Sequence, residues 1–198
     1  MTSLLIIISP GQDMVLVISR SIASGAKAGM MVALGISVGL LGHTLLAVLG
    51  LGALLQASEF AFTAMKMVGA GYLLYMGIQT LRSPPVVFAA EKPAPARMRS
   101  LFMLGAFANL SNPKIAIFYL AYLPQFVSVE SGAATWMLLI LGVAFALLTA
   151  LVKIPVGYLA GTLSRWFQEN PKAQTWLHRI SGGVLIGLAA KLATEGPR

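Results

Sequence analysis

Two short polar stretches interrupt hydrophobic segments of this chain, and each holds residue types that can bind a charged molecule. The stretches share a small polar residue, a proline and a charged side chain: Ser9, Pro10, Gly11 and Asp13 in the first, and Asn112, Pro113 and Lys114 in the second. Lys114 stands at the centre of the apolar run 101–127, too far from either end to snorkel easily to a membrane surface. Asp13 is the only acidic residue within any apolar run.

Both stretches have the chemistry of helix starts. Asn112 is expected to be an N-cap with Pro113 at the first helical position, where its missing N–H costs nothing. Ser9 and Gln12 fit an S-x-x-Q capping box, with Pro10 at the first position. A helix that restarts inside a membrane exposes N–H groups and the positive end of its dipole, and these bind anions. Paired breaks therefore predict a binding site, although a single proline can also be a simple kink.

Other residues could take part in this site or only pack. Asp13 is a candidate for binding an ammonium group or a proton, and its alternative role is a structural bridge to Lys114. His43 is a candidate proton carrier, although a buried histidine is more often a packing residue. Tyr72 is a candidate pocket wall within an aromatic stripe, a pattern that usually indicates helix packing. Lys153 and Lys66 lie nearer the ends of their segments, so we expect them to be snorkelling anchors.

The composition places these residues in a membrane protein. Hydrophobic residues make up 58% and charged residues 10% of the 198-residue chain, whereas a soluble domain carries about a quarter charged residues. The mean hydropathy of +0.83 leaves too little polar surface to cover a soluble core. Six apolar runs are long enough to cross a hydrocarbon layer of about 30 Å: residues 4–22, 29–56, 60–81, 101–127, 133–163 and 176–192. None shows the period-two alternation of barrel strands, so we expect an all-α integral membrane fold.

The six segments are expected to form two inverted three-helix repeats, with segments one and four broken by proline. Ser24-Gly25 matches Ser131-Gly132 and Gly35 matches Gly142 at one shift, and an odd number of spans per repeat turns the second repeat upside down. The stretch 83–99, rich in proline and alanine, indicates a linker between repeat one (1–82) and repeat two (100–198) of a single membrane domain. Three G-x-x-x-G patterns predict close helix contacts: Gly35 and Gly39, Gly157 and Gly161, and Gly183 and Gly187.

The basic residues predict the orientation in the membrane. Nine of the 14 fall in alternate connections: Arg20, Lys27, Arg82, Lys92, Arg97, Arg99, Arg165, Lys172 and Arg179. The intervening connections carry Glu59 and Glu130 and no Lys or Arg. By the positive-inside rule the basic connections, including the linker, face the cytoplasm and the C-terminus lies outside, while the first segment either crosses fully or enters and returns. The net charge of +8 is thus a topology signal, and its scatter does not indicate nucleic-acid binding.

Several classes of function are excluded by what the sequence lacks. It has no cysteine, so disulfides, thiol redox centres and thiolate metal sites are impossible. The N-terminus has neither the basic region nor the cleavage site of a signal peptide. The stretch 35–39, GISVG, fits G-x-S-x-G, but it lies inside a membrane helix rather than at a strand-to-helix elbow. No metalloprotease, P-loop or dinucleotide motif occurs, and we expect neither an enzyme nor a bound cofactor.

Three stretches resemble the LysE/RhtB family of bacterial amino-acid exporters. They are residues 9–55, 66–83 and 102–127, and the resemblance is most specific at Asn112-Pro113-Lys114 and at the G-x-x-Y-L-x-Y-x-G pattern of 69–77. The similarity covers nearly the whole chain in the same order. It implies a bacterial inner-membrane carrier that exports amino acids or derivatives such as homoserine, threonine, leucine or lysine, driven by the proton gradient.

The residues and the resemblance together predict export of a small zwitterionic or cationic amino acid by alternating access. The substrate carboxylate would lie against the helix starts at 9–11 and 112–114 and the Lys114 ammonium. The substrate ammonium would face Asp13 with Tyr72 beside it, and Asp13 or His43 would take the coupling proton. A divalent metal-ion exporter of related architecture is the alternative, although such a site usually needs more acidic or histidine ligands. A channel subunit or scaffold would not need Lys114 at mid-depth, and the number of subunits, a homo-oligomer included, stays open.

Overall fold

The computed structural model describes residues 2–8, 11–57, 59–82, 84, 96–126, 134–163, 166 and 170–194. All regular elements of this part of the chain are helical, in agreement with the predicted all-α fold. The α-helices are α1 (Thr2–Ile8), α2 (Gln12–Ser24), α3 (Ala26–Ala57), α4 (Glu59–Arg82), α5 (Met98–Leu110), α6 (Pro113–Ile117), α7 (Ala134–Thr162) and α9 (Pro171–Thr194). A π-helical turn, η1 (Phe118–Tyr122), and a 3-10 turn, η2 (Leu123–Phe126), continue from α6. Most of the predicted linker 83–99 lies outside the described residues.

Segments one and four are each divided into two helices, as the sequence predicts. The first consists of α1 and α2, and the fourth consists of α5 and α6, where Met98–Leu110 and Pro113–Tyr122 meet at a bend of 51°. Ala26–Gly50 in α3 and Thr135–Thr162 in α7 are each long and apolar enough to cross a membrane, and the bent pair would be a third span if it is one unit. The full set of six spans remains a prediction.

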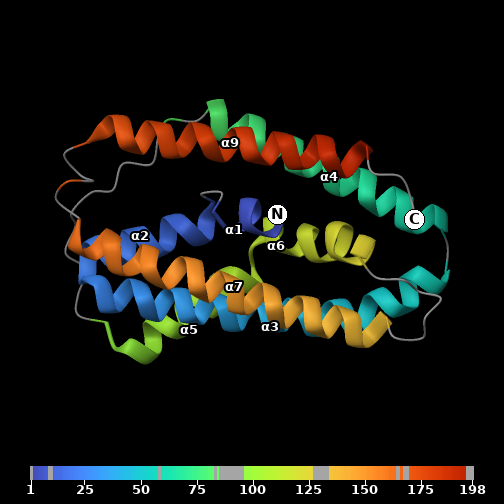
Figure 1. The fold of residues 1–198 in the computed structure, drawn as a ribbon, viewed down its shortest axis with the longest axis horizontal. Helices are drawn as coiled ribbons and strands as arrows, with labels where there is room; N and C mark the ends of the chain where they lie inside the picture. Colours follow the sequence, from blue (N-terminus) through green and yellow to red (C-terminus); the bar gives the residue numbers. More distant parts are fainter. Residues whose placement is uncertain are drawn as a thin grey trace.

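The helices pack in pairs, and the two members of a pair would be corresponding helices of the two predicted repeats. Helix α3 packs along α7 and α5, α4 packs along α9, and α2 packs against both α3 and α7. Figure 1 shows that α3 and α7 run in opposite directions, as do α4 and α9, and that α1 and α6 lie between these two pairs. Opposite directions are what an inverted repeat requires, but the repeat itself stays a prediction.

Glycines allow the closest helix contacts, and two of the three G-x-x-x-G patterns lie where the sequence predicts. A β-carbon at Gly35 would overlap the carbonyl oxygen of Phe102, so only glycine lets α3 approach α5 this closely. A β-carbon at Gly161 would come within 2.5 Å of the backbone of Ala26, at the contact between α7 and α3. Both contacts are backbone against backbone, which side-chain adjustment cannot relieve.

The prediction of a close helix contact at the third G-x-x-x-G pattern, Gly183 and Gly187, is wrong. At Gly183 and Gly187, no atom of the described part of the chain lies within 4 Å of an added β-carbon, so these glycines make no close helix contact there. The contact between α4 and α9 uses Gly77 and Gly182 instead, because a β-carbon at Gly77 would lie 3.1 Å from the Gly182 carbonyl oxygen. The spacing was informative, but the sequence could not show which face of α9 meets α4.

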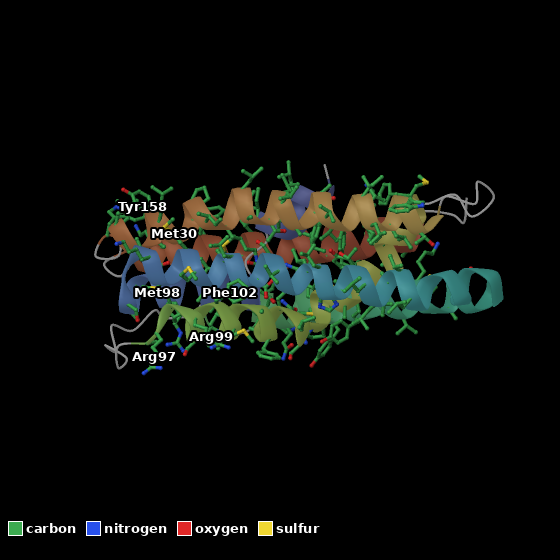
Figure 2. All side chains as sticks on the ribbon, turned by 90° about the horizontal axis from the view of Figure 1, so that it is seen from below. Met30, Arg97, Met98, Arg99, Phe102 and Tyr158 are labelled. Carbon is green, nitrogen blue, oxygen red and sulfur yellow. The ribbon has the colours of Figure 1, made fainter. Side chains whose placement is uncertain are left out.

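The outer surface of the bundle is apolar. Leu49, Val68 and Leu151 are between 72% and 77% exposed, and large apolar side chains of this kind extend over several helices (Figure 2). Water-soluble proteins do not leave continuous apolar surfaces of this extent uncovered. The surface therefore suits contact with lipid.

Several of the basic residues lie towards one end of the bundle, although Lys191 lies at the other end, in the last turn of α9. Arg97 and Arg99 lie at the start of α5 (Figure 2), at the end where α2 also passes into α3 (Figure 1). Lys27, Arg82 and Lys172 lie in terminal turns of α3, α4 and α9 at this end, and Arg20 lies shortly before the last turn of α2. This arrangement agrees with the charge pattern behind the predicted orientation, while the side of the membrane that this end faces remains a prediction.

Candidate binding site at the two helix breaks

The second break forms the helix start that the sequence predicts. Asn112 is the N-cap of α6, its side-chain oxygen accepts a hydrogen bond of 3.1 Å from the Lys114 N–H, and Pro113 is the first helical residue. The Asn112 carbonyl accepts the N–H groups of Ile115 and Ala116, each at 3.1 Å. The N–H groups of Lys114, Ile115 and Ala116 at the start of α6 therefore have partners within the chain, and anion binding at this helix start stays a prediction.

The first break differs from the prediction in the position of its cap. Helix α2 begins at Gln12 with Gly11 as its N-cap and with no side-chain capping bond, so the predicted cap at Ser9 is wrong. Ser9 and Pro10 themselves lie outside the described residues. A β-carbon at Gly11 would lie 3.4 Å from the Lys114 Nζ, which shows how closely the second break approaches the first.

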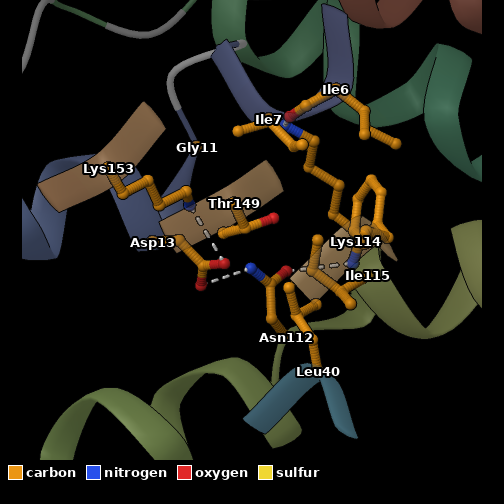
Figure 3. A pocket seen from close by; sticks show the side chains of 11 residues that line it. Ile6, Ile7, Gly11, Asp13, Leu40, Asn112, Lys114, Ile115, Thr149 and Lys153 are labelled. Atoms are coloured by element: carbon orange, nitrogen blue, oxygen red, sulfur yellow. Dashed lines mark hydrogen bonds and ion pairs between the residues drawn. The ribbon is translucent and has the colours of Figure 1, made fainter. Parts of the chain in front are cut away.

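Asp13 joins the two breaks. Its carboxylate is buried, and it accepts a hydrogen bond of 2.8 Å from the side-chain amide of Asn112 (Figure 3). It accepts a second bond of 2.8 Å from the side-chain amide of Asn109. A bond also runs from the second break to the first broken segment, because the Lys114 Nζ donates to the carbonyl oxygen of Ile6 in α1 at 3.3 Å. Segments whose contacting residues stand 99 positions apart in the sequence are thus linked by buried polar bonds.

Lys153 is the ion-pair partner of Asp13, at 3.3 Å between Nζ and Oδ2, and both residues are 4% exposed. The prediction that Lys153 is a snorkelling anchor is therefore wrong. The ion pair also takes the place of the bridge between Asp13 and Lys114 that the sequence offered as an alternative. Lys66 is only 5% exposed, so its assignment as a surface anchor is wrong as well. Distance to a helix end did not show which way these lysines point.

A small cavity lies where the breaks meet (Figure 3). Its polar lining is Asp13, Asn112, Lys114, Thr149 and Lys153, and its remaining lining is Gly11, Ile6, Ile7, Leu40, Ile115 and Phe145. The volume is about 10 Å³, enough for about one water molecule. In this conformation the protein's own side chains fill the site.

Thr149 brings an unused hydrogen-bonding group to this cavity. The buried hydroxyls of Ser21, Ser37 and Thr44 bond to the carbonyl four residues before them, as such side chains commonly do in helices. The buried Thr149 Oγ1 has no hydrogen-bond partner among the residues that the structure describes. Since Phe145, Thr149 and Lys153 are spaced by four residues on α7, all three face the cavity. That spacing was the sequence signal that would have placed Lys153 and Thr149 in the site.

His43 and Asn109 form a second buried layer beside the break. The His43 Nε2 lies 3.1 Å from the Asn109 carbonyl oxygen, and the His43 ring stacks on Tyr119 with 5.5 Å between centroids. Asn109 is fully buried and was missed by the sequence analysis, although its position three residues before Asn112 would have suggested it. Tyr72 is not brought to the site: it is half-buried on α4, its ring is 6.2 Å from that of Tyr75, and it does not line the cavity.

Aromatic rings cover the cavity on the side of η1. Phe145, which lines the cavity, stacks on Phe118 with 4.7 Å between ring centroids, and Phe118 stacks on Tyr122 at 5.3 Å. The stripe of aromatic residues near the second break is thus mainly a packing feature. No group of three His, Asp or Glu side chains within the described ranges could hold a metal ion.

Comparison with known proteins identifies a family model and several relatives that match nearly the whole chain. Residues 4–196 match the family model described as LysE type translocator. An uncharacterized membrane protein of Bacillus subtilis (strain 168) is 30% identical over 94% of this chain and 92% of its own length. The homoserine/homoserine lactone efflux protein of Salmonella typhimurium (strain LT2) is 30% identical over 98% of this chain and 93% of its own length. No solved structure matches this chain.

Proposed function

The chain belongs to the LysE type translocator family, and from that premise we propose that it is a proton-driven exporter of amino acids of the homoserine, threonine, leucine or lysine type. The site where the two broken segments meet would be its substrate site. Among similar proteins, the one from Salmonella is named for homoserine and homoserine lactone efflux, which supports an amino-acid-type substrate for this chain.

The observation that carries the proposal is the pairing of opposite charges at the site. One buried acidic side chain, Asp13, and two buried lysines, Lys114 and Lys153, line one cavity whose other lining is mainly apolar. Buried ionisable groups in a membrane protein are costly and usually functional. An amino acid carries one ammonium and one carboxylate, so it can pair with both kinds of group at once.

The proposed binding mode exchanges partners within the site. The substrate ammonium replaces the Lys153 Nζ at Asp13, where Asn109 and Asn112 continue to hold the carboxylate. The substrate carboxylate then lies between the ammonium groups of Lys153 and Lys114, close to the start of α2 at Gly11, where the helix dipole favours an anion. The cavity must widen for this step, because its present volume is about 10 Å³.

Proton coupling is assigned to Asp13 or His43. Protonation of Asp13 would weaken its hold on an ammonium group, and His43 contacts the same break through the Asn109 carbonyl. Rocking of the two inverted repeats would open the cavity alternately to each side, with the aromatic rings of Phe118 and Phe145 moving apart on the η1 side. The linker would face the cytoplasm of a bacterial inner membrane, and the C-terminus would lie outside.

The test is efflux from proteoliposomes that contain the purified protein and radiolabelled homoserine. An imposed proton gradient is expected to drive saturable efflux, and a proton ionophore is expected to abolish the driven component. Efflux no faster than from protein-free liposomes, for homoserine, threonine, leucine and lysine alike, would refute the proposal. No observation in the described part of the chain specifically supports a divalent metal-ion exporter, so we propose the amino-acid function alone.

A further inference from the structure

The charges that line the cavity do not balance. Among the described residues that line it, Asp13 is the one acidic residue, whereas Lys114 and Lys153 are two basic residues. The rest of the wall is apolar apart from Asn112 and the Thr149 hydroxyl. A site with this lining can distinguish ligands by their charged groups.

We propose that this site selects amino acids that have a free carboxylate and an uncharged side chain, and that Lys153 enforces this selection. The inference rests on the proposed function and narrows it. It means that amino acids with a cationic side chain, which the sequence alone left open, are poor substrates. Amino-acid lactones are poor substrates as well, in contrast to what the name of the Salmonella relative gives for that protein.

The need for a free carboxylate follows from the ion pair that the substrate must break. When a substrate ammonium takes the place of Lys153 at Asp13, the Lys153 ammonium loses its partner at 3.3 Å while it is still buried. A buried charge that loses its partner is strongly unfavourable. The substrate carboxylate can replace that partner, whereas a lactone, whose carboxyl group is esterified, cannot.

The need for an uncharged side chain follows from the apolar wall. Ile6, Ile7, Leu40, Ile115 and Phe145 would surround the substrate side chain, and none can solvate a charge. A cationic side chain would also be repelled by the two lysines at short range, where the local dielectric is low. The Thr149 Oγ1, which has no partner in the described part of the chain, can bond to the substrate without requiring a charge.

The first experiment uses the wild-type protein and ligands matched in size. Labelled homoserine is exchanged across proteoliposomes, and three unlabelled compounds compete with it: homoserine, 2,4-diaminobutyrate and homoserine lactone. Diaminobutyrate has the chain length of homoserine with an ammonium in place of the hydroxyl. The lactone is used at mildly acidic pH, where its amine is protonated and the ring opens slowly. We expect half-inhibition to require at least about tenfold more diaminobutyrate or lactone than homoserine.

The second experiment tests the role of Lys153. Lys153→Met is expected to slow homoserine exchange and to lower the discrimination against diaminobutyrate by at least about threefold, because one repelling charge is gone. Lys172→Met, on the exposed start of α9, is the matched control and should keep the wild-type ratio. A purely structural role of Lys153 would slow the exchange of all compounds without changing the ratio.

The outcomes separate this inference from the proposed function. Equal competition by homoserine, diaminobutyrate and lactone in the wild type would overturn the inference and leave amino-acid export standing. An unchanged ratio in a folded Lys153→Met protein would remove Lys153 from the selection. Absence of homoserine exchange in the wild type would overturn the proposed function, and the inference with it.

Discussion

At the scale of single residues, the carboxylate of Asp13 connects three parts of the bundle. It bonds to Asn109 at the end of α5, to Asn112 at the start of α6, and to Lys153 in α7. The sequence could predict Asp13, Asn112 and Lys114, because a proline and a charge inside an apolar run are conspicuous. It could not predict the Lys153 pair, because an apolar run does not reveal the direction of one side chain.

The Asp13–Lys153 pair predicts that a single change destabilises the protein and that the double change restores its stability, because either single change leaves a buried charge without its partner. Asp13→Asn leaves the buried Lys153 ammonium without its carboxylate partner, which should destabilise the protein by about 3–5 kcal/mol and lower its membrane abundance. Adding Lys153→Met removes the unpaired charge and should restore abundance but not homoserine export. Abundance by immunoblot and efflux from cells test both parts. Recovery of export together with abundance would show that the pair is structural only.

The unused hydroxyl of Thr149 predicts a loss of function without a loss of stability. Thr149→Val keeps the shape of the side chain and removes a buried polar group that has no partner within the described ranges, so the free energy of unfolding should stay the same or rise. If the hydroxyl bonds to the substrate, the KM for homoserine should rise by about fivefold, which corresponds to about 1 kcal/mol. Thermal unfolding and proteoliposome kinetics give the two values. A KM equal to that of the wild type would exclude Thr149 from the site.

At the scale of helices, the two breaks and the glycine contacts place the site. The sequence could predict both breaks, because capping residues and proline are local signals. The paired breaks also predicted one shared site, but not the contacts that join them, since these depend on how α2, α5 and α7 pack around α3. The displaced cap at Gly11 and the replacement of Gly183 by Gly182 at the α4 contact have the same cause, because tertiary packing decides which of several suitable neighbours is used.

The contact between α3 and α5 predicts different effects for two glycines of one helix. Gly35→Ala would force a methyl group into the Phe102 backbone, and overpacking of this kind costs about 1–3 kcal/mol. Gly50→Ala, also on α3, meets nothing within 4 Å and should be neutral or stabilising by up to about 1 kcal/mol. The unfolding temperatures of the purified variants test this. A Gly35→Ala protein as stable as Gly50→Ala would contradict the close approach of α3 and α5.

At the scale of the whole molecule, an apolar exterior surrounds a small charged centre, and several of the basic residues lie towards one end. The apolar exterior and the basic residues at one end follow from composition and could be predicted from the sequence. The orientation that they imply is testable because the chain has no cysteine. Single substitutions at exposed positions, Ser100→Cys before the second break and Thr194→Cys at the end of α9, then give unambiguous labels.

A membrane-impermeant maleimide applied to intact spheroplasts should label Thr194→Cys and not Ser100→Cys, because the linker end is expected in the cytoplasm. A permeant maleimide should label both, which controls for accessibility. The opposite pattern would reverse the orientation and therefore the direction in which the site opens.

The most direct test of the central claim is binding at the site where the two breaks meet. A ligand at about a hundredfold excess over its Kd stabilises the folded protein by about 2.7 kcal/mol, which thermal unfolding detects. Homoserine should therefore raise the unfolding temperature of the wild-type protein and leave that of the Asp13→Asn/Lys153→Met protein unchanged, although both are folded. An equal rise in the two proteins, or no rise in the wild type at saturating homoserine, would contradict the assignment of this cavity as the substrate site.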